Sequence, residues 1–331
     1  MRTERLLTAV ILGLLLIAAI AVPSGFLPIG LFVSKTLQVS ANLKVPPLDD
    51  PAMIRRGAVH YDIICAGCHA SPVAPHRADH LRLTPPAPRL HLRRDGWLPE
   101  VLFLTVKHGV PNSAMPTWPA KGRDDEVWSM VAFLQVLPDL DAPNYAEFAG
   151  LSAGAGTGIS GICARCHGAA GQGDATGAFP RLDIQSPEYL RSSLRAYRNG
   201  QRQSGFMAGV AGALNDTEIM QLSVQFAGTQ TDQAPIRQPP GTADDGKARR
   251  LSACAACHGP QGVARPAFPS LSGQSADYLA AQLHLFAQDP FTRGGGPFVD
   301  LMRQAGHDLT EADILEAVEW YAQPSKPERA Q

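Results

Sequence analysis

Hydrophobic residues are most concentrated at the start of this 331-residue chain. Residues 6–22 are apolar apart from Thr8 and Gly13, and no charged residue follows until Lys35. A membrane-spanning helix needs about 17–25 consecutive apolar residues, whereas an export signal has an apolar core of about 7–15. The pattern therefore predicts an N-terminal transmembrane helix, followed by a linker, within residues 1–45.

A cleaved signal peptide is the alternative interpretation of the same segment. The Ala-Ile-Ala sequence at 19–21 resembles a cleavage site, but cleavage there would leave the apolar stretch 26–33 at the mature N-terminus. Arg2 and Arg5 place the short N-terminal end in the cytoplasm by the positive-inside rule. Under either interpretation the rest of the chain is exported.

Beyond residue 45 the order of polar and apolar positions favours helices over strands. We expect a short helix over 51–64, further helices that begin after Pro187 and after Ser275, and closing helices over 124–137, 216–226 and 310–321. Each closing helix begins at an Asp or Thr that we expect to act as its N-cap, with Glu in the first turn. The predicted fold class is mainly α.

Composition and charge narrow the possible functions. Hydrophobic residues make up 45% of the chain and charged residues 18%, which excludes disorder over most of its length. The net charge of −1 gives no basic excess, so we expect no nucleic-acid partner. Aromatic residues are only 7%, which is sparse for cores of this size and points to a bound group that fills them.

All six cysteines lie in three copies of one motif, in which two cysteines are separated by two residues and followed at once by histidine. This is the attachment signal for c-type haem: both thiols bond to the porphyrin, and the adjacent imidazole ligates the iron. We therefore predict three covalently bound haem c groups. The thioether residues are Cys65, Cys68, Cys163, Cys166, Cys254 and Cys257, and the iron ligands are His69, His167 and His258.

Other cysteine chemistries fit this pattern less well. A structural zinc site needs four ligands, so each Cys-Cys-His set would be one ligand short. A thioredoxin-like redox pair or a plain disulfide has no need of a histidine after the second cysteine in every copy. Covalent haem is therefore preferred over zinc and disulfides.

The motifs divide the chain into units. They begin at residues 65, 163 and 254, with Pro-rich linkers between them, so one haem per unit is the simplest arrangement. We predict an anchor or signal over 1–45 and haem domains over 46–142, 143–235 and 236–331, which we call units one, two and three. Units two and three are internal repeats: Phe-Pro-x-Leu occurs at 179–182 and 268–271, and Gln-Ser-x-x-Tyr-Leu at 185–190 and 274–279.

A low-spin haem electron carrier needs a second axial iron ligand, most often Met or His. In unit two we favour Met207, which lies in a Gly-rich loop, whereas Met220 lies inside the closing helix and is interpreted as core packing. Met302 occupies the equivalent repeat position in unit three. In unit one, Met115 lies among the loop residues 111–116. We predict these three methionines as ligands.

Histidines provide the alternative ligands. In unit three, His284 and His307 are interpreted as surface or hydrogen-bonding residues. Unit one contains further histidines from which a second His ligand could come, namely His60, His76, His80, His91 and His108. The remaining unit-one methionines, Met53 and Met130, are interpreted as packing residues.

No catalytic constellation accompanies these motifs. The Gly-rich run at 154–158 has no preceding strand and is interpreted as a connector, and the run at 293–296 as a loop. Iron with both axial positions filled by the protein exchanges electrons and does not bind substrate. We therefore expect an electron carrier or electron-transfer subunit, with no enzyme activity of its own and no small-molecule substrate.

The motifs carry a family resemblance. The chain resembles the class I c-type cytochromes, and residues from about 150 to 330 are similar to the tandem diheme cytochromes c of the c-four group. The shared features are the two Cys-Ala-x-Cys-His-Gly motifs, the repeated segments, Met207 and Met302. Unit one is similar to the single-haem modules of respiratory complex subunits through its motif and the Met115-Pro116 pair.

This resemblance implies electron transfer between respiratory redox protein partners, for example from a dehydrogenase or quinol-oxidising complex towards a terminal oxidase. Together with the anchor and the third unit, it implies a triheme protein in the bacterial inner membrane with its haem domains on the periplasmic side. The alternative is a haem enzyme or ligand-binding sensor with an open iron site, such as a peroxidase.

Overall fold

The computed structural model describes residues 43–75, 83–93, 96–151, 158–228, 254–259, 266–288 and 291–322. The predicted N-terminal helix and the linker after residue 228 lie outside these ranges. Within them, no helix has both the length and the apolar character that crossing a membrane requires. This part of the chain is mainly helical, as expected, and its β pairing is limited to isolated bridges, one of which joins Arg202 to Gly294.

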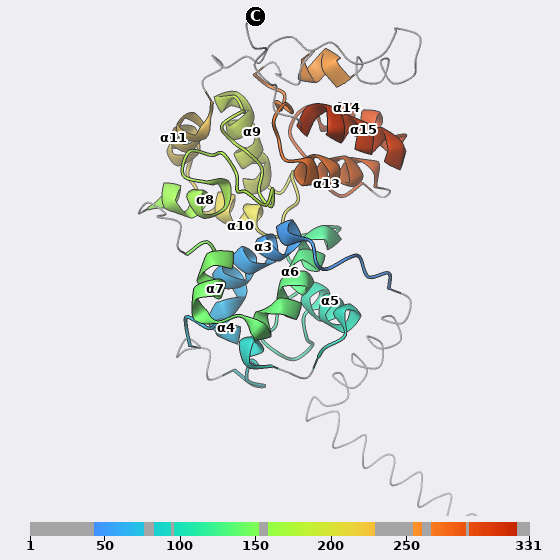
Figure 1. Ribbon diagram of the computed structural model, residues 1–331. Helices are drawn as coiled ribbons and strands as arrows, with labels where there is room; N and C mark the ends of the chain where they lie inside the picture. Colours follow the sequence, from blue (N-terminus) through green and yellow to red (C-terminus); the bar gives the residue numbers. More distant parts are fainter. Residues whose placement is uncertain are drawn as a thin grey trace, which may run out of the picture.

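The first lobe contains the helices of unit one, with α3 packed along α6 (Figure 1). Its elements are α3 (Pro51–His60), a π-helical turn (Tyr61–Cys65), α4 (Ala66–His69), a 3-10 turn (Leu90–Leu92), α5 (Pro99–His108), α6 (Asp124–Val136), a second 3-10 turn (Leu137–Asp139) and α7 (Ala142–Phe148). The predicted helix over 51–64 is confirmed, and its last turn widens into the π-helical turn that leads into the first motif.

Helix α7 extends the first lobe beyond the residues assigned to unit one. It begins at residue 142, where the sequence places the boundary, yet Tyr145 is fully buried against Tyr61 and Phe133 of the unit-one core. The Tyr145 hydroxyl also donates to Asp62 at 2.9 Å. The chain therefore leaves the first lobe only after this helix.

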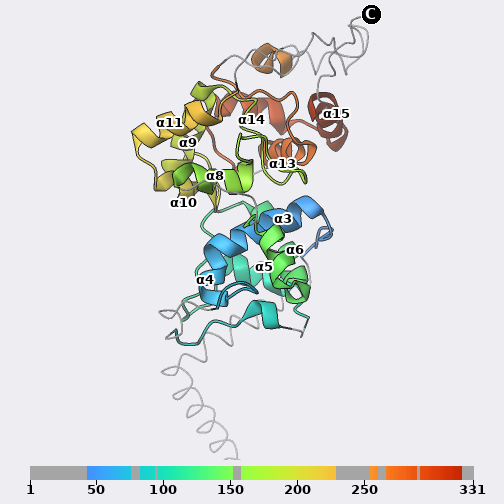
Figure 2. The same cartoon turned by 60° about the vertical axis from the view of Figure 1, so that its left-hand side comes forward.

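The second lobe places units two and three side by side (Figures 1 and 2). Unit two supplies α8 (Ile159–His167), α9 (Pro187–Arg198), α10 (Met207–Gly212) and α11 (Asp216–Phe226), and unit three supplies the helical residues 254–258, α13 (Ala276–Ala287), α14 (Val299–His307) and α15 (Glu311–Ala322). The cores are small: Leu190, Ile219 and Phe226 are buried in one, and Leu279 and Tyr321 in the other.

The predicted closing helices are confirmed as α6, α11 and α15, but two of their predicted caps are wrong. Asp216 is the first residue of α11, and Asn215 is the cap, in a reciprocal pair of hydrogen bonds with Glu218. Asp124 likewise lies inside α6, where its carboxylate binds Lys107 at 2.8 Å. The Asp124 side chain binds Lys107 and not the backbone of its own first turn, so residue type alone misplaced this cap.

Helix α3 joins the two lobes. Ala52 and Val59 of α3 are buried in one cluster with Cys166 and Phe206 of unit two. Because apolar residues from both units share this cluster, units one and two form a packed interface rather than a tethered pair.

Candidate functional site

Each of the three motif histidines is oriented by the backbone carbonyl of a proline in its own unit. The Nδ1···O distances are 2.9 Å for His69 and Pro88, 2.8 Å for His167 and Pro180, and 2.8 Å for His258 and Pro269. Because a carbonyl can only accept, Nδ1 carries the proton and Nε2 keeps its lone pair. This is the tautomer that ligates a metal through Nε2, and the outer hydrogen bond fixes the ring's orientation.

The sequence showed these prolines only as part of a repeated segment. Pro180 and Pro269 are the second residues of the Phe-Pro-x-Leu repeats, and Pro88 begins the Pro-Arg-Leu sequence of unit one. Their role became visible only with the fold, because each carbonyl reaches a histidine 11 to 19 positions earlier in the chain.

The six motif cysteines are all described and none forms a disulfide. Burial raises the pKa of Cys166 to about 12 and, with repulsion from Cys68, that of Cys65 to about 12. Such values disfavour the thiolate form of these two cysteines, whereas a reactive redox thiol has a lowered pKa. The free thiols are consistent with their predicted addition to a porphyrin, which stays a prediction.

One cavity of about 640 Å³ runs through the second lobe. Its wall contains the complete predicted haem sets of units two and three, namely Cys163, Cys166, His167 and Met207, and Cys254, Cys257, His258 and Met302. Apolar side chains of both repeats, including Leu190 and Leu279, form much of the remaining wall. The fold thus brings together the residues that the sequence predicts for two haems.

The predicted loop position of Met207 is wrong, although its place on the cavity wall suits an iron ligand. Met207 is the first residue of α10, because the Gly-rich segment folds as a short helix whose Val210 packs against the interface cluster. Met302 lies within α14. Met220 is 51% exposed, so it is a surface residue and not a core residue. Ligation by Met207 and Met302 stays a prediction.

The predicted haem residues of unit one lie outside this cavity. Cys65 packs against the first-lobe core, and His69 is the last residue of α4. Met115 lies in a tight loop after α5: its N–H donates to Ser113 Oγ at 3.1 Å, and its carbonyl accepts from Val110 at 3.2 Å. Ligation by Met115 also stays a prediction.

Unit one nevertheless contributes to the second-lobe cavity, which sequence reasoning did not anticipate. Its contributing residues are Arg56, His60, Arg123, Asp125 and Glu126. His60 is 4% exposed and stacks on Phe206 of unit two, with ring centroids 4.2 Å apart. Burial, followed by repulsion from Arg56 and Arg123, lowers the pKa of His60 to about 3, so its ring is neutral.

Two buried arginines show that the cavity fits a haem. Arg202 and Arg293 are 6% and 8% exposed. Their hydrogen-bond partners are neutral, chiefly the Tyr278 hydroxyl for Arg202 and the Gln282 amide oxygen for Arg293. No carboxylate pairs with either guanidinium among the residues that the structure describes. Burial and repulsion from Arg202 lower the pKa of Arg293 to about 10. Buried cations of this kind need anions, and the propionates of a haem would supply them.

The chain is similar to known c-type cytochromes over both lobes. Residues 52–134 match the family model described as cytochrome C oxidase, cbb3-type, subunit III. The thiosulfate dehydrogenase electron acceptor of Stutzerimonas stutzeri is 34% identical over 179 residues, which are 51% of this chain and 82% of that protein. The protein of the same name from Thiomonas intermedia is 31% identical over 180 residues, 51% of this chain and 81% of that protein.

Cytochrome c4 is a further relative. The protein from Pseudomonas aeruginosa is 31% identical over 198 residues, which cover 57% of this chain and 96% of its own length.

Proposed function

Since the chain belongs to the class I c-type cytochromes and contains a portion like the diheme cytochrome c4, we propose that it is a membrane-anchored triheme protein that relays electrons between redox protein partners. Its relatives are electron-transfer cytochromes c, which supports the carrier role. The third haem, the N-terminal anchor and the periplasmic location rest on the sequence motifs and are part of the proposal.

The observation that carries the proposal is the cavity of the second lobe. It places two Cys-Cys-His-Met sets in one wall, each with its histidine oriented by a proline carbonyl. When bound, each haem supplies a one-electron iron couple. A histidine and a methionine on the same iron would fill both axial positions and raise the reduction potential relative to two histidines.

Cysteine, proline and apolar residues of the chain would each hold or surround the haems in a different way. The cysteines attach the porphyrin, and Pro180 and Pro269 keep the imidazole rings in the ligating tautomer. Burial lowers the pKa of His167 and of His258, which further favours the neutral ring. The apolar side chains of the cavity wall would give a bound haem surroundings of low polarity, which tune its reduction potential.

The names of the relatives suggest a class of partner. We propose a periplasmic dehydrogenase as electron donor and a terminal oxidase on the acceptor side, supported by the two thiosulfate dehydrogenase electron acceptors and by the oxidase-subunit family that matches residues 52–134. Mixing the oxidised chain with a thiosulfate dehydrogenase and thiosulfate should reduce its haems within the turnover time of that enzyme. If the haems stay oxidised, a thiosulfate dehydrogenase is not the electron donor of this chain.

Carbon monoxide tests the carrier role against the alternative of a haem enzyme or sensor. Reduced haem with both axial positions filled by protein does not bind carbon monoxide readily, so the absorption spectrum of the reduced chain should not change. A Met207→Ala variant opens one iron and serves as the positive control. A shifted Soret band in the unmodified chain would favour the enzyme or sensor.

A further inference from the structure

We propose that unit one positions the second iron ligand of unit two: Glu126, Trp118 and His60 fix the segment Ser204–Phe206, which directly precedes Met207. The inference rests on the proposed function, because it takes Met207 as an iron ligand. It goes further by assigning to unit one a control over the iron site of another unit.

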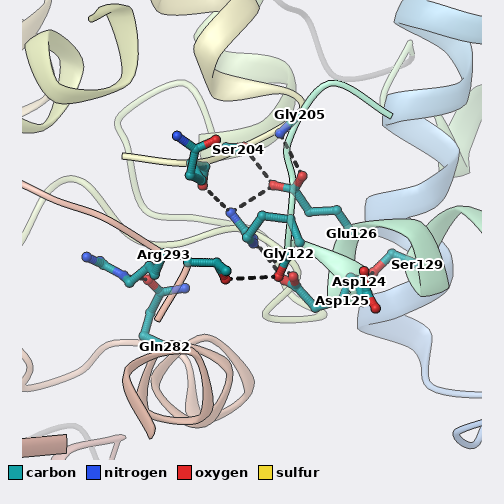
Figure 3. Close-up of polar contacts among 12 residues, drawn as sticks. Gly122, Asp124, Asp125, Glu126, Ser129, Ser204, Gly205, Gln282 and Arg293 are labelled. Carbon is teal, nitrogen blue, oxygen red and sulfur yellow. Dashed lines mark hydrogen bonds and ion pairs between the residues drawn. The ribbon is translucent and has the colours of Figure 1, made fainter. Parts of the chain in front are cut away.

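Glu126 forms the centre of the contact (Figure 3). Its side chain comes from the first turn of α6 and is 3% exposed. One carboxylate oxygen accepts from the Ser204 hydroxyl at 2.7 Å, and the other accepts from the Gly205 N–H at 2.7 Å. Both donors belong to unit two, so a single buried carboxylate of unit one fixes two consecutive residues of its neighbour.

Ser204 links Glu126 to Met207, the predicted iron ligand. Its Oγ, which donates to Glu126, also accepts from the N–H of Met207 at 3.1 Å and of Phe206 at 3.3 Å. The start of α10 is therefore tied to Glu126 through one hydroxyl. A displacement of that hydroxyl moves the backbone from which the Met207 side chain projects.

Gly205 and Phe206 are fixed by aromatic rings of unit one. A Cβ on Gly205 would lie 2.5 Å from the Trp118 indole nitrogen, so only glycine allows this close approach. The same indole donates to Glu126 at 3.1 Å. Phe206 stacks on His60 with an interplanar angle of 14°. Each residue of the segment therefore contacts at least one side chain of unit one.

Arg123 completes the charge balance. Its guanidinium pairs with Glu126 at 3.0 Å and with Asp125 at 2.8 Å, and it donates to the Gln203 carbonyl at 2.6 Å. A buried carboxylate with hydrogen-bonded partners on all sides is rigid, and the loss of its charge leaves several buried donors unsatisfied. These bonds hold Glu126 and the segment Ser204–Phe206 in a single arrangement.

The two repeats differ at this point. Met302 lies inside α14, and its N–H donates to the Phe298 carbonyl within unit three. The position of Met207 depends on another unit, whereas the backbone of Met302 is fixed by its own helix. We therefore expect a change at Glu126 to alter the unit-two haem and leave the unit-three haem unchanged.

The test uses the full chain with its haems attached and the variants Glu126→Gln, Glu126→Ala and Ser204→Ala. Proton NMR of the reduced protein resolves the ring-current-shifted methyl signal of each methionine ligand, and a redox titration gives the potentials. Met207→Ala identifies the signal and the potential that belong to unit two. Gln225→Ala is the control, because Gln225 is an exposed residue of unit two on α11.

We expect all three variants to shift or abolish the Met207 methyl signal and to lower the unit-two potential. The Met302 signal should stay unchanged, and the Gln225→Ala protein should behave like the unmodified chain. Glu126→Gln keeps the side-chain volume, so it answers the question if Glu126→Ala fails to fold. An unchanged Met207 signal and unit-two potential in Glu126→Gln and Ser204→Ala would overturn the inference. If Met207→Ala itself removes no methyl signal, the ligand assignment is wrong and the inference falls with it.

Discussion

Gln185 and Gln274 occupy equivalent positions in the two repeats, and each binds the backbone of the other repeat in the same way. Gln185 donates to the Ser270 carbonyl at 2.8 Å and accepts from the Ser270 N–H at 2.9 Å. Gln274 makes the same pair of bonds with Arg181, at 3.0 and 2.8 Å. In each case the bound residue directly follows the proline that orients the motif histidine. The hydrogen bonds between the repeats therefore lie one residue after Pro180 and Pro269, whose carbonyls orient His167 and His258.

This reciprocity predicts a matched loss of stability. Gln185→Ala removes a buried amide and both of its hydrogen bonds to the Ser270 backbone, which should lower the free energy of unfolding by about 1–3 kcal/mol. Gln274→Ala should cost a similar amount. Denaturant unfolding of the haem-loaded chain measures both.

Gln225→Ala is the matched control, since Gln225 is an exposed residue of α11. It should change the free energy of unfolding by no more than about 0.5 kcal/mol. A Gln185→Ala protein as stable as this control would show that the reciprocal bonds contribute nothing measurable.

Replacement of the predicted methionine ligands should change the haem spectrum. Met207→Ala and Met302→Ala should each abolish one iron–sulfur charge-transfer band and lower one reduction potential, because thioether ligation favours the reduced iron. Met220→Ala serves as the control, since its side chain is largely exposed on α11. The assignment is wrong if Met220→Ala removes a band and Met207→Ala does not.

The buried His60 predicts a pH dependence of stability. Its pKa falls from 6.5 in the unfolded chain to about 3 in the fold. Between these two pH values the unfolded state binds a proton at His60 and the folded state does not. The contribution of His60 to the free energy of unfolding is therefore fully present above pH 6.5 and is lost as the pH falls below that value. Between pH 7 and pH 5 this group should cost about 2 kcal/mol.

A difference between variants isolates that contribution. The His60→Phe protein should lose about 2 kcal/mol less than the unmodified chain over this pH range, as measured by denaturant unfolding at both values. His307→Asn should behave like the unmodified chain, because His307 is a surface residue next to Asp308. Equal pH dependence in His60→Phe and the unmodified chain would mean that His60 is not buried as described.

Local sequence patterns predicted the closing helices and the helices after Ser186 and Ser275, but not α5, α7, α10 or α14 and not the contacts between units. The helices that begin at Pro187 and Ala276 follow Ser186 and Ser275, whose hydroxyls accept from the backbone three residues later. A capping signal of this kind is complete within four residues, so it can be recognised in the sequence.

The contacts between units depend on residues far apart in the chain. Glu126 resembled an ordinary acidic residue in the first turn of a helix, yet its partners Ser204 and Gly205 lie nearly 80 positions later. The sequence assigned Tyr145 to unit two, because the predicted boundary lies before it. Its burial against Tyr61, which the sequence does not show, places it in the first lobe. Such pairings have no local signature, which is why the sequence indicated the haem residues and not their supports.

The N-terminal apolar run predicts retention in the membrane. After cell lysis the chain should sediment with membranes and stay there through a high-salt wash, because an apolar span is not screened by ions. Release by salt, or a mature N-terminus just after the Ala-Ile-Ala sequence at 19–21, would favour the cleaved signal.

The number of covalent haems is the most direct test of the whole account. Three motifs use every cysteine, and two of the three sets line one cavity of the second lobe. Intact-mass measurement of the chain, matured in a host with haem-attachment machinery, should show the polypeptide mass plus three haem increments. A fully matured protein that carries two increments or fewer would contradict the proposal of a triheme electron carrier.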